Sequence, residues 1–192
     1  MAIGTQITAE EYARRERGDQ RSELVRGEVV PLNPPGRRHC RVCARVSRLL
    51  GNFVEERNLG EVFCNDLGVV TERNPDTVRA ADVAFFLSGA DADESDDPGY
   101  GETPPFLIFE VASPSDRMER VLRKAAEYLA VGVAVVVNLD PARRTAVVFT
   151  NQVPVATFGP AEVLALPEPL AELRLTVGQW VQRPAAPPIA PL

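Results

Sequence analysis

Lysine, histidine and cysteine are scarce in this sequence. Among its 192 residues and 21 basic side chains, Lys124 is the only lysine and His39 is the only histidine. Arginine therefore supplies almost all of the positive charge, and a position that keeps the compact, flexible ammonium group of lysine is a candidate functional position. The alternative is that one lysine remains on the surface by chance. The three cysteines form an odd, sparse set, which favours reduced thiols over a disulfide framework.

Long apolar runs are absent as well. The longest candidate covers residues 131–139, far short of the roughly 20 residues that span a bilayer, and is typical of a buried strand. The first residues are polar and charged, with no apolar stretch before a small-residue cleavage site, which argues against a secretory signal. We therefore expect a cytoplasmic protein without a membrane partner.

The overall composition is that of an ordinary globular protein. Hydrophobic residues make up 45% and charged residues 25%, which excludes disorder, collagen and a coiled coil as the main architecture. A chain of this length suits one domain with a sizeable core. We expect a single domain over residues 1–183, followed by a flexible tail at 184–192 that contains Pro184, Pro187, Pro188 and Pro191.

The distribution of charge bears on nucleic-acid binding. The formal net charge is −6, whereas a protein that only coats nucleic acid is normally basic. However, residues 91–97 carry five carboxylates, while residues 37–57 carry six arginines against two glutamates. Arg41, Arg45 and Arg48 recur there at helical spacing and form a basic stripe, which is either a solvated face or a track for phosphate groups. A localised contact with an anion therefore fits the sequence.

Apolar periodicity, turn residues and caps indicate the order of helices and strands. We expect helices at about 9–17, 38–58 and 113–131 and a last helical turn at 176–182, with Gly60 capping the longest helix. The remaining pattern predicts a hairpin at 22–32 and strands at 61–64, 67–72, 79–87, 106–111, 133–139, 144–149 and 152–157. This order predicts an α+β fold, a mixed β-sheet flanked by helices with one parallel strand–helix–strand crossover at 106–139.

Asp82 and Glu110 each lie inside an apolar strand segment. Burial of a carboxylate is costly unless the group is paired, protonated or bound to a cation. If the two strands are neighbours, the carboxylates converge on one point, where their oxygen atoms suit a hard cation such as Mg²⁺. Lys124 follows on the next helix, which packs back across the sheet, so its side chain can reach the same point. The alternative is that each carboxylate faces solvent or an arginine.

Several short motifs occur in the order of a known family. They are Thr8-Ala9-Glu10-Glu11-Tyr12, Ser22-Glu23-Leu24-Val25-Arg26-Gly27-Glu28, His39, Asp82-Val83-Ala84-Phe85, Phe109-Glu110-Val111-Ala112-Ser113-Pro114-Ser115, Lys124 with Tyr128 and Gly132, and Asp140-Pro141. The ordered set, which covers about residues 5–182, resembles the Uma-type restriction endonucleases, bacterial members of the PD-(D/E)xK phosphodiesterase superfamily. The resemblance implies a restriction-endonuclease-like fold.

The resemblance also implies roles for individual residues. Asp82 and Glu110 would hold Mg²⁺ or Mn²⁺, with the carbonyl group of Val111 as a third ligand. Glu23 would complete the acidic cluster as a second-metal or water-orienting group. Lys124 would replace the lysine that the parent motif carries two residues after the glutamate, and would orient the attacking water or stabilise the transition state. The implied activity is a metal-dependent endonuclease that hydrolyses phosphodiester bonds in DNA.

Other expectations concern substrate, partners and alternative functions. His39, Arg41, Arg45 and Tyr128 are candidate substrate contacts, and paired cuts of a duplex favour a homodimer or a higher homo-oligomer. The family's usual proline before the aspartate is Ala81 here, a change that affects the backbone and removes no ligand. The alternative function is a catalytically inactive accessory or oligomeric protein that keeps the nuclease fold and associates with nucleic acid.

A zinc protein is a third hypothesis. His39, Cys40, Cys43 and Cys64 supply four ligands of the types that zinc prefers. However, the Cys40–Cys43 spacing lies inside the predicted long helix, and Cys43 falls on its apolar side. The pattern therefore favours small thiols in an apolar environment.

Overall fold

A computed structural model describes residues 6–15, 21–90, 99–113 and 116–182. The helices in this part of the chain are α1 (Ala9–Arg14), α2 (Arg37–Glu56), α3 (Met118–Ala130) and α4 (Val177–Val181). The strands are β1 (Ser22–Val25), β2 (Glu28–Pro31), β3 (Gly60–Glu72), β4 (Thr77–Leu87), β5 (Leu107–Val111), β6 (Val135–Asp140), β7 (Thr145–Thr150) and β8 (Ala156–Phe158). The predicted tail and the acidic segment 91–97 lie outside the described residues.

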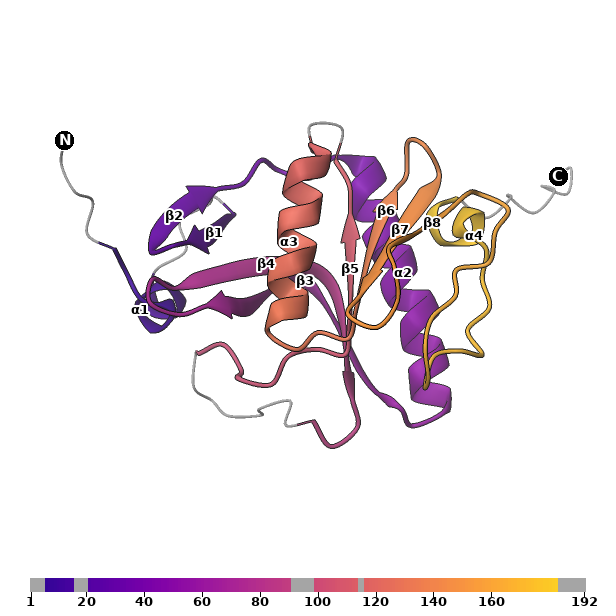
Figure 1. Ribbon diagram of the computed structural model, residues 1–192, viewed down its shortest axis with the longest axis horizontal. Coiled ribbons are helices and arrows are strands. Elements are labelled where there is room, and N and C mark those ends of the chain that lie inside the picture. Colours follow the sequence, from indigo (N-terminus) through magenta and orange to yellow (C-terminus); the bar gives the residue numbers. More distant parts are fainter. Residues whose placement is uncertain (1–5, 16–20, 91–98, 114–115, 183–192) are drawn as a thin grey trace, which may run out of the picture.

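The described strands form one mixed sheet of eight strands in the order β2-β1-β4-β5-β6-β7-β8, with β3 paired to β4. Each strand pairing among the described residues is antiparallel except that between β5 and β6, whose connection runs through α3. The α+β fold and its single parallel crossover are therefore confirmed. In Figure 1, α3 lies in front of the sheet and α2 behind it, so helices cover both faces.

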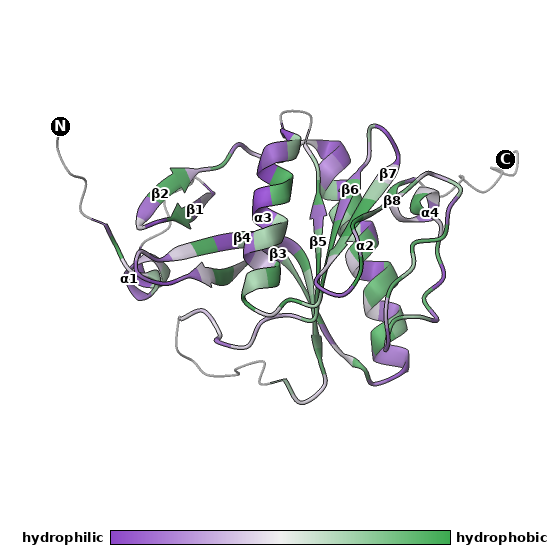
Figure 2. Ribbon diagram, in the orientation of Figure 1, coloured by the Kyte–Doolittle hydropathy of each residue, from purple (hydrophilic) through white to green (hydrophobic). Residues whose placement is uncertain are grey.

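The two helices pack on opposite faces because successive strand residues point in opposite directions. Residues of α2 and α4 pack against Val83 and Phe109, whereas α3 packs against Ala84 and Ile108. The buried positions of α2 recur every four residues, at Val42, Val46, Leu50 and Val54. In Figure 2, the central strands are mainly hydrophobic, while α3 carries both hydrophilic and hydrophobic residues.

β4 has a different set of partners along each edge, and this arrangement opens space for a site. Val78 pairs with Val70 of β3 and with Leu24 of β1, and Val83 pairs with β3 and with Phe109 of β5. β3 therefore follows one edge of β4, while β1 and β5 share the other edge. Between the β1 and β5 pairings, residues 79–82 of β4 have side-chain and main-chain groups available for other contacts.

Local structure differs from the sequence expectations at several places. The first helix ends at Arg14 instead of residue 17, and the last strand begins at Ala156 instead of residue 152. Three further differences have a clear physical reason. The segments 61–64 and 67–72 form one strand, β3, in which Asn65 and Asp66 take positive φ angles of 74° and 63° at a register shift. Gly60 is not the cap of α2, which ends earlier, with Asn58 in the left-handed region at φ 52°. At Gly60 a Cβ atom would lie 1.9 Å from the carbonyl oxygen of Phe86, so close strand pairing explains this glycine.

The third difference is the start of α3. The helix begins at Met118 instead of about residue 113. The side chain of Asp116 accepts a hydrogen bond from the main-chain N–H of Ser113 at 2.7 Å, and the Asp116 N–H donates to the Ser113 carbonyl group at 3.0 Å. These bonds form a separate turn, because aspartate competes for main-chain donors in non-helical conformations.

Candidate active site

The two predicted carboxylates lie side by side on β4 and β5. Val83 of β4 pairs with Phe109 of β5 in an antiparallel register. Asp82 comes directly before Val83 and Glu110 directly after Phe109, so the two carboxylates are neighbours across the strands. Asp82 accepts a hydrogen bond from the main-chain N–H of Val111 at 2.7 Å. This bond ties the carboxylate of one strand to the end of its neighbour, so both acidic groups face the same pocket.

Lys124 of α3 reaches Glu110, as the crossover geometry predicts. Its Nζ atom lies 2.9 Å from the Glu110 carboxylate, 2.9 Å from the Ala80 carbonyl oxygen and 3.1 Å from Glu23. Tyr128, one turn further along α3, donates a hydrogen bond of 2.9 Å to the second Glu110 oxygen. Both α3 side chains therefore converge on one carboxylate.

Glu23 enters the site from β1 and is almost fully buried, with 1% of its surface exposed. It accepts hydrogen bonds from the Ala80 N–H at 3.2 Å and from Arg79 at 3.0 Å, besides its ion pair with Lys124. Burial raises the pKa of Glu23, but the positive charges of Lys124 and Arg79 outweigh it and hold the pKa below its usual value. Glu23 therefore stays ionised at neutral pH.

Arg79 and Glu127 belong to this network, although sequence reasoning did not identify them. Arg79 of β4 makes two hydrogen bonds to Glu127 of α3, of 2.5 and 2.9 Å, and donates a third to Glu23. Charge-assisted, two-pronged contacts of this kind hold side chains in a defined orientation. Glu127 lies three residues after Lys124, a helical spacing that could have indicated a shared face. No local pattern indicates that Arg79 joins them.

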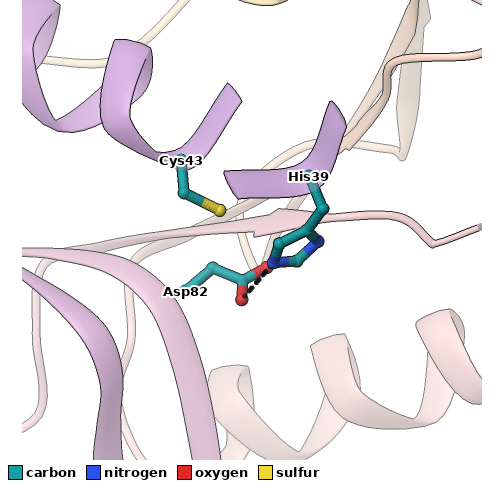
Figure 3. A group of neighbouring side chains, drawn as sticks. All are labelled: His39, Cys43 and Asp82. Carbon is teal, nitrogen blue, oxygen red and sulfur yellow. Dashed lines mark ion pairs between the residues drawn. The ribbon is translucent and has the colours of Figure 1, made fainter. Parts of the chain in front are cut away.

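His39 lies at the start of α2 and faces Asp82. Its Nε2 atom is 3.2 Å from an Asp82 oxygen, and Figure 3 shows Cys43 beside the same carboxylate. The hydrogen bond to Asp82 raises the pKa of His39, against burial that lowers it, with further support from the main chain of Val111. His39 therefore contacts a predicted metal-binding carboxylate directly.

Of these groups, Glu23, His39, Asp82, Glu110 and Lys124 line a pocket of about 120 Å³, and Tyr128 does not. Its lining also includes two arginines, Arg21 and Arg120, and the amide side chain of Asn138. Arg41 and Arg45 do not line it. The Arg45 guanidinium instead donates a hydrogen bond to the main-chain carbonyl group of Gln179, in α4. The arginines beside the pocket are thus not those of the predicted basic stripe.

The donors in the pocket fit a divalent cation. Desolvation raises the pKa of Glu110 to about 7, Lys124 counteracts this effect, and the negative charge of Asp82 adds to it. A cation between two such carboxylates would relieve both the desolvation and the repulsion. Asp82, Glu110 and Val111 all line the pocket, so carboxylate oxygens of the kind that Mg²⁺ or Mn²⁺ prefers are present.

The four-ligand zinc site of the third hypothesis does not form among the described residues. Cys40 and Cys64 are exposed, and the metal-binding types of side chain that do gather are His39, Cys43 and Asp82. The reason is the geometry of α2, which places Cys43 one turn from His39 on the side that faces the sheet, while Cys40 points outward.

A mixed sheet with a strand–helix–strand crossover, and with a lysine and carboxylates gathered where β1, β4 and β5 meet, is the arrangement expected of the restriction-endonuclease-like fold. The chain belongs to the Uma2 family, described as "Putative restriction endonuclease", whose sequence profile matches residues 9–178. The predicted family resemblance is confirmed.

Proteins similar to this chain include one relative in sequence and one solved structure. The uncharacterized protein sll1609 of Synechocystis sp. is 30% identical over 138 residues, which cover 64% of this chain and 73% of that protein. A crystal structure from Anabaena variabilis, described as "a putative nuclease belonging to DUF820", superposes with a TM-score of 0.78 at 18% identity. This superposition covers 91% of this chain and 97% of that one and shows that the fold is shared. Among the described residues, no helix is both long and apolar enough to cross a membrane.

Proposed function

We propose that the protein is a Mg²⁺- or Mn²⁺-dependent endonuclease that hydrolyses phosphodiester bonds in DNA. The observation that carries the proposal is the contact of Lys124 with Glu110, 2.9 Å apart, beside Asp82 on the neighbouring strand. Asp82, Glu110 and the Val111 carbonyl group would hold the ion. When bound, the ion acts as a Lewis acid toward the phosphate and lowers the pKa of a coordinated water.

Lys124 supplies positive charge next to the scissile phosphate. An ammonium group has three donors, and the contacts with Ala80, Glu110 and Glu23 account for all of them. Lys124 therefore stabilises the developing negative charge through its field, or exchanges one of these acceptors for a phosphate oxygen or the attacking water. In either role, Lys124 stabilises the transition state most strongly in a partly desolvated site such as this one.

In this proposal, Glu23 positions the Lys124 side chain. Both of its oxygen atoms are already engaged, by Arg79 on one side and by Lys124 and the Ala80 N–H on the other. These contacts support a role in positioning Lys124, ahead of the second-metal or water-orienting roles that the family resemblance implies. Tyr128 positions Glu110 in the same way, through its hydroxyl group.

The substrate proposal rests on the family and on two arginines beside the pocket. Arg120 lies in the first turn of α3 with about half of its side chain exposed, 3.6 Å from Glu23. Arg21 also lines the pocket and pairs with Asp66. Both can contact DNA phosphates flanking the cut, and cleavage of both strands favours a homodimer or higher homo-oligomer, which light scattering in solution tests.

The decisive experiment measures cleavage of supercoiled plasmid, single-stranded DNA and RNA with Mg²⁺ or Mn²⁺. We expect DNA cleavage by the wild type and a rate loss of at least about 100-fold in Asp82→Asn and in Lys124→Ala. Asp140→Asn is the matched control, since this carboxylate pairs with Arg143 outside the pocket. Cleavage that survives in both variants would place the activity elsewhere, and an inactive, folded wild type would favour the accessory-protein alternative.

A further inference from the structure

His39, Cys43 and Asp82 bring three kinds of metal ligand to one point. His39 and Cys43 are four residues apart on α2, so they share a face of the helix. Asp82 reaches the same point from β4, as Figure 3 shows. One ligand atom from each residue can be chosen so that all three lie within 4.8 Å of one another, and the closest pair, His39 Nε2 and Asp82, is 3.2 Å apart.

These separations suit a small tetrahedral ion. Ligand atoms at ordinary zinc–nitrogen, zinc–oxygen and zinc–sulfur bond lengths lie roughly 3.4–3.7 Å from one another. The imidazole nitrogen and the carboxylate oxygen, 3.2 Å apart, lie slightly closer together than that, and side-chain movement of about 1 Å brings the thiol sulfur into range. The Nδ1 atom of His39 is buried without a hydrogen-bond partner among the described residues, so Nε2 is the nitrogen directed at Asp82.

The chemistry of the donors distinguishes this group from the oxygen ligands of the nuclease centre. Thiolate and imidazole favour Zn²⁺ over Mg²⁺, because Mg²⁺ prefers hard oxygen ligands and octahedral geometry. Asp82 is common to both sets, whereas Glu110 and Lys124 belong only to the nuclease centre. An ion held by His39 and Cys43 would therefore draw the Asp82 carboxylate toward α2.

We propose that His39, Cys43 and Asp82 form a Zn²⁺ site that competes with the catalytic ion for Asp82 and thereby inhibits the enzyme. Binding forms one bond from Zn²⁺ to each of Nε2, Sγ and a carboxylate oxygen, releases the thiol proton of Cys43 to solvent, and leaves a fourth position for water. The existence of the site is independent of the nuclease activity, and only its inhibitory effect rests on the proposed function.

Co²⁺ is the spectroscopic probe for the site, since it takes the same tetrahedral ligands and its absorption reports them. We expect one equivalent of Co²⁺ to give tetrahedral visible bands and a near-ultraviolet thiolate-to-cobalt charge-transfer band, both displaced by Zn²⁺. The double variant Cys40→Ser/Cys64→Ser keeps Cys43 as its only thiol and is expected to keep the band. Cys43→Ser is expected to lose it.

Two results would contradict the proposed Zn²⁺ site. One is Co²⁺ bound to the wild type without a charge-transfer band, a measurement that needs no variant to fold. The other is loss of the band in Cys40→Ser/Cys64→Ser, which would assign the metal to the exposed cysteines. X-ray absorption of the zinc-loaded double variant adds a direct check, with one sulfur neighbour expected at about 2.3 Å.

The inhibitory effect is tested separately, by adding Zn²⁺ to cleavage reactions supported by Mg²⁺. Two proteins are compared, the double variant Cys40→Ser/Cys64→Ser and a triple variant that also carries Cys43→Ser. We expect the zinc concentration that halves the cleavage rate to be at least about tenfold higher for the triple variant. Equal zinc sensitivity of the two proteins would refute competition at Asp82. If no protein cleaves DNA while the charge-transfer band behaves as expected, the Zn²⁺ site stands and the proposed nuclease function fails.

Discussion

Substitution Arg79→Met tests whether the buried ion network holds α3 against the sheet. The Arg79 side chain is one-tenth exposed, and its guanidinium group makes two hydrogen bonds to Glu127, of 2.5 and 2.9 Å, and one of 3.0 Å to Glu23. Methionine keeps much of the apolar length of the side chain but none of the charge. Glu23, with 1% of its surface exposed, would then retain two cationic partners, Lys124 at 3.1 Å and the half-exposed Arg120 at 3.6 Å.

The expected loss in the free energy of unfolding follows from the burial of the Arg79–Glu23 ion pair. Removing one member of a buried ion pair typically destabilises a protein by about 3–5 kcal/mol, because the remaining charge stays desolvated. For a chain of this size, about 1 kcal/mol corresponds to roughly 2–4 °C in Tm, so we expect Tm to fall by about 6–20 °C. Urea unfolding followed by the fluorescence of Trp180, the single, fully buried tryptophan, measures the free energy directly.

Arg143→Met is the matched control for this experiment. Arg143 also pairs with a carboxylate, Asp140, at 2.8 Å, but its side chain is 82% exposed. Exposed pairs of this kind contribute about 1 kcal/mol or less. A loss below about 1 kcal/mol in Arg79→Met, or equal losses in the two variants, would refute the reasoning that burial makes the Arg79 network indispensable.

Three further predictions concern the core, the metal and pH. Leu50→Ala, at a fully buried position of α2, should cost about 2–5 kcal/mol in urea unfolding, whereas half-exposed Leu122→Ala should change stability by about 0.5 kcal/mol or less. Asp82→Asn should weaken Mn²⁺ binding, measured by electron paramagnetic resonance, at least about tenfold, and unchanged affinity would exclude Asp82 as a ligand. Burial raises the pKa of Asp76, but two main-chain N–H groups and Arg73 lower it below its usual value. Because the pKa of Asp76 is lower in the folded state than its value of about 3.9 in the unfolded state, Asp76 stabilises the fold above that pH, and this stabilisation is lost as the pH falls. The urea midpoint of Asp76→Asn should therefore change less between pH 7 and acidic pH than that of the wild type.

Much of the fold could be predicted because it depends on local patterns. The four-residue repeat of Val42, Val46 and Leu50 identifies the buried face of α2 before any contact is known. Asp82 and Glu110 could be selected as site residues because a charge inside an apolar strand is unusual wherever the strand lies. Thr8 and Glu11 form the capping box that starts α1, again from neighbouring residues alone.

Local patterns predict the ends of helices less well than their existence. Gly60 resembles a helix cap in sequence, yet the carbonyl group of Phe86, 26 residues away, is what excludes a side chain there. The turn at Ser113 and Asp116 delays α3 because a side-chain acceptor captures a main-chain donor before the helix begins. In both cases a contact decided between two conformations that the local sequence permits.

The sequence by itself determined the elements of the fold, the faces they bury and the residue types that could bind a metal or carry charge. Tertiary structure alone decided which of them meet. The pairing of β1 with β4 places Glu23 beside Arg79 and Lys124, and the packing of α2 on the sheet places His39 and Cys43 beside Asp82. Such contacts depend on strand register and helix packing across long stretches of chain. No periodicity within a single element encodes them, because each element buries the same face whichever partner covers it.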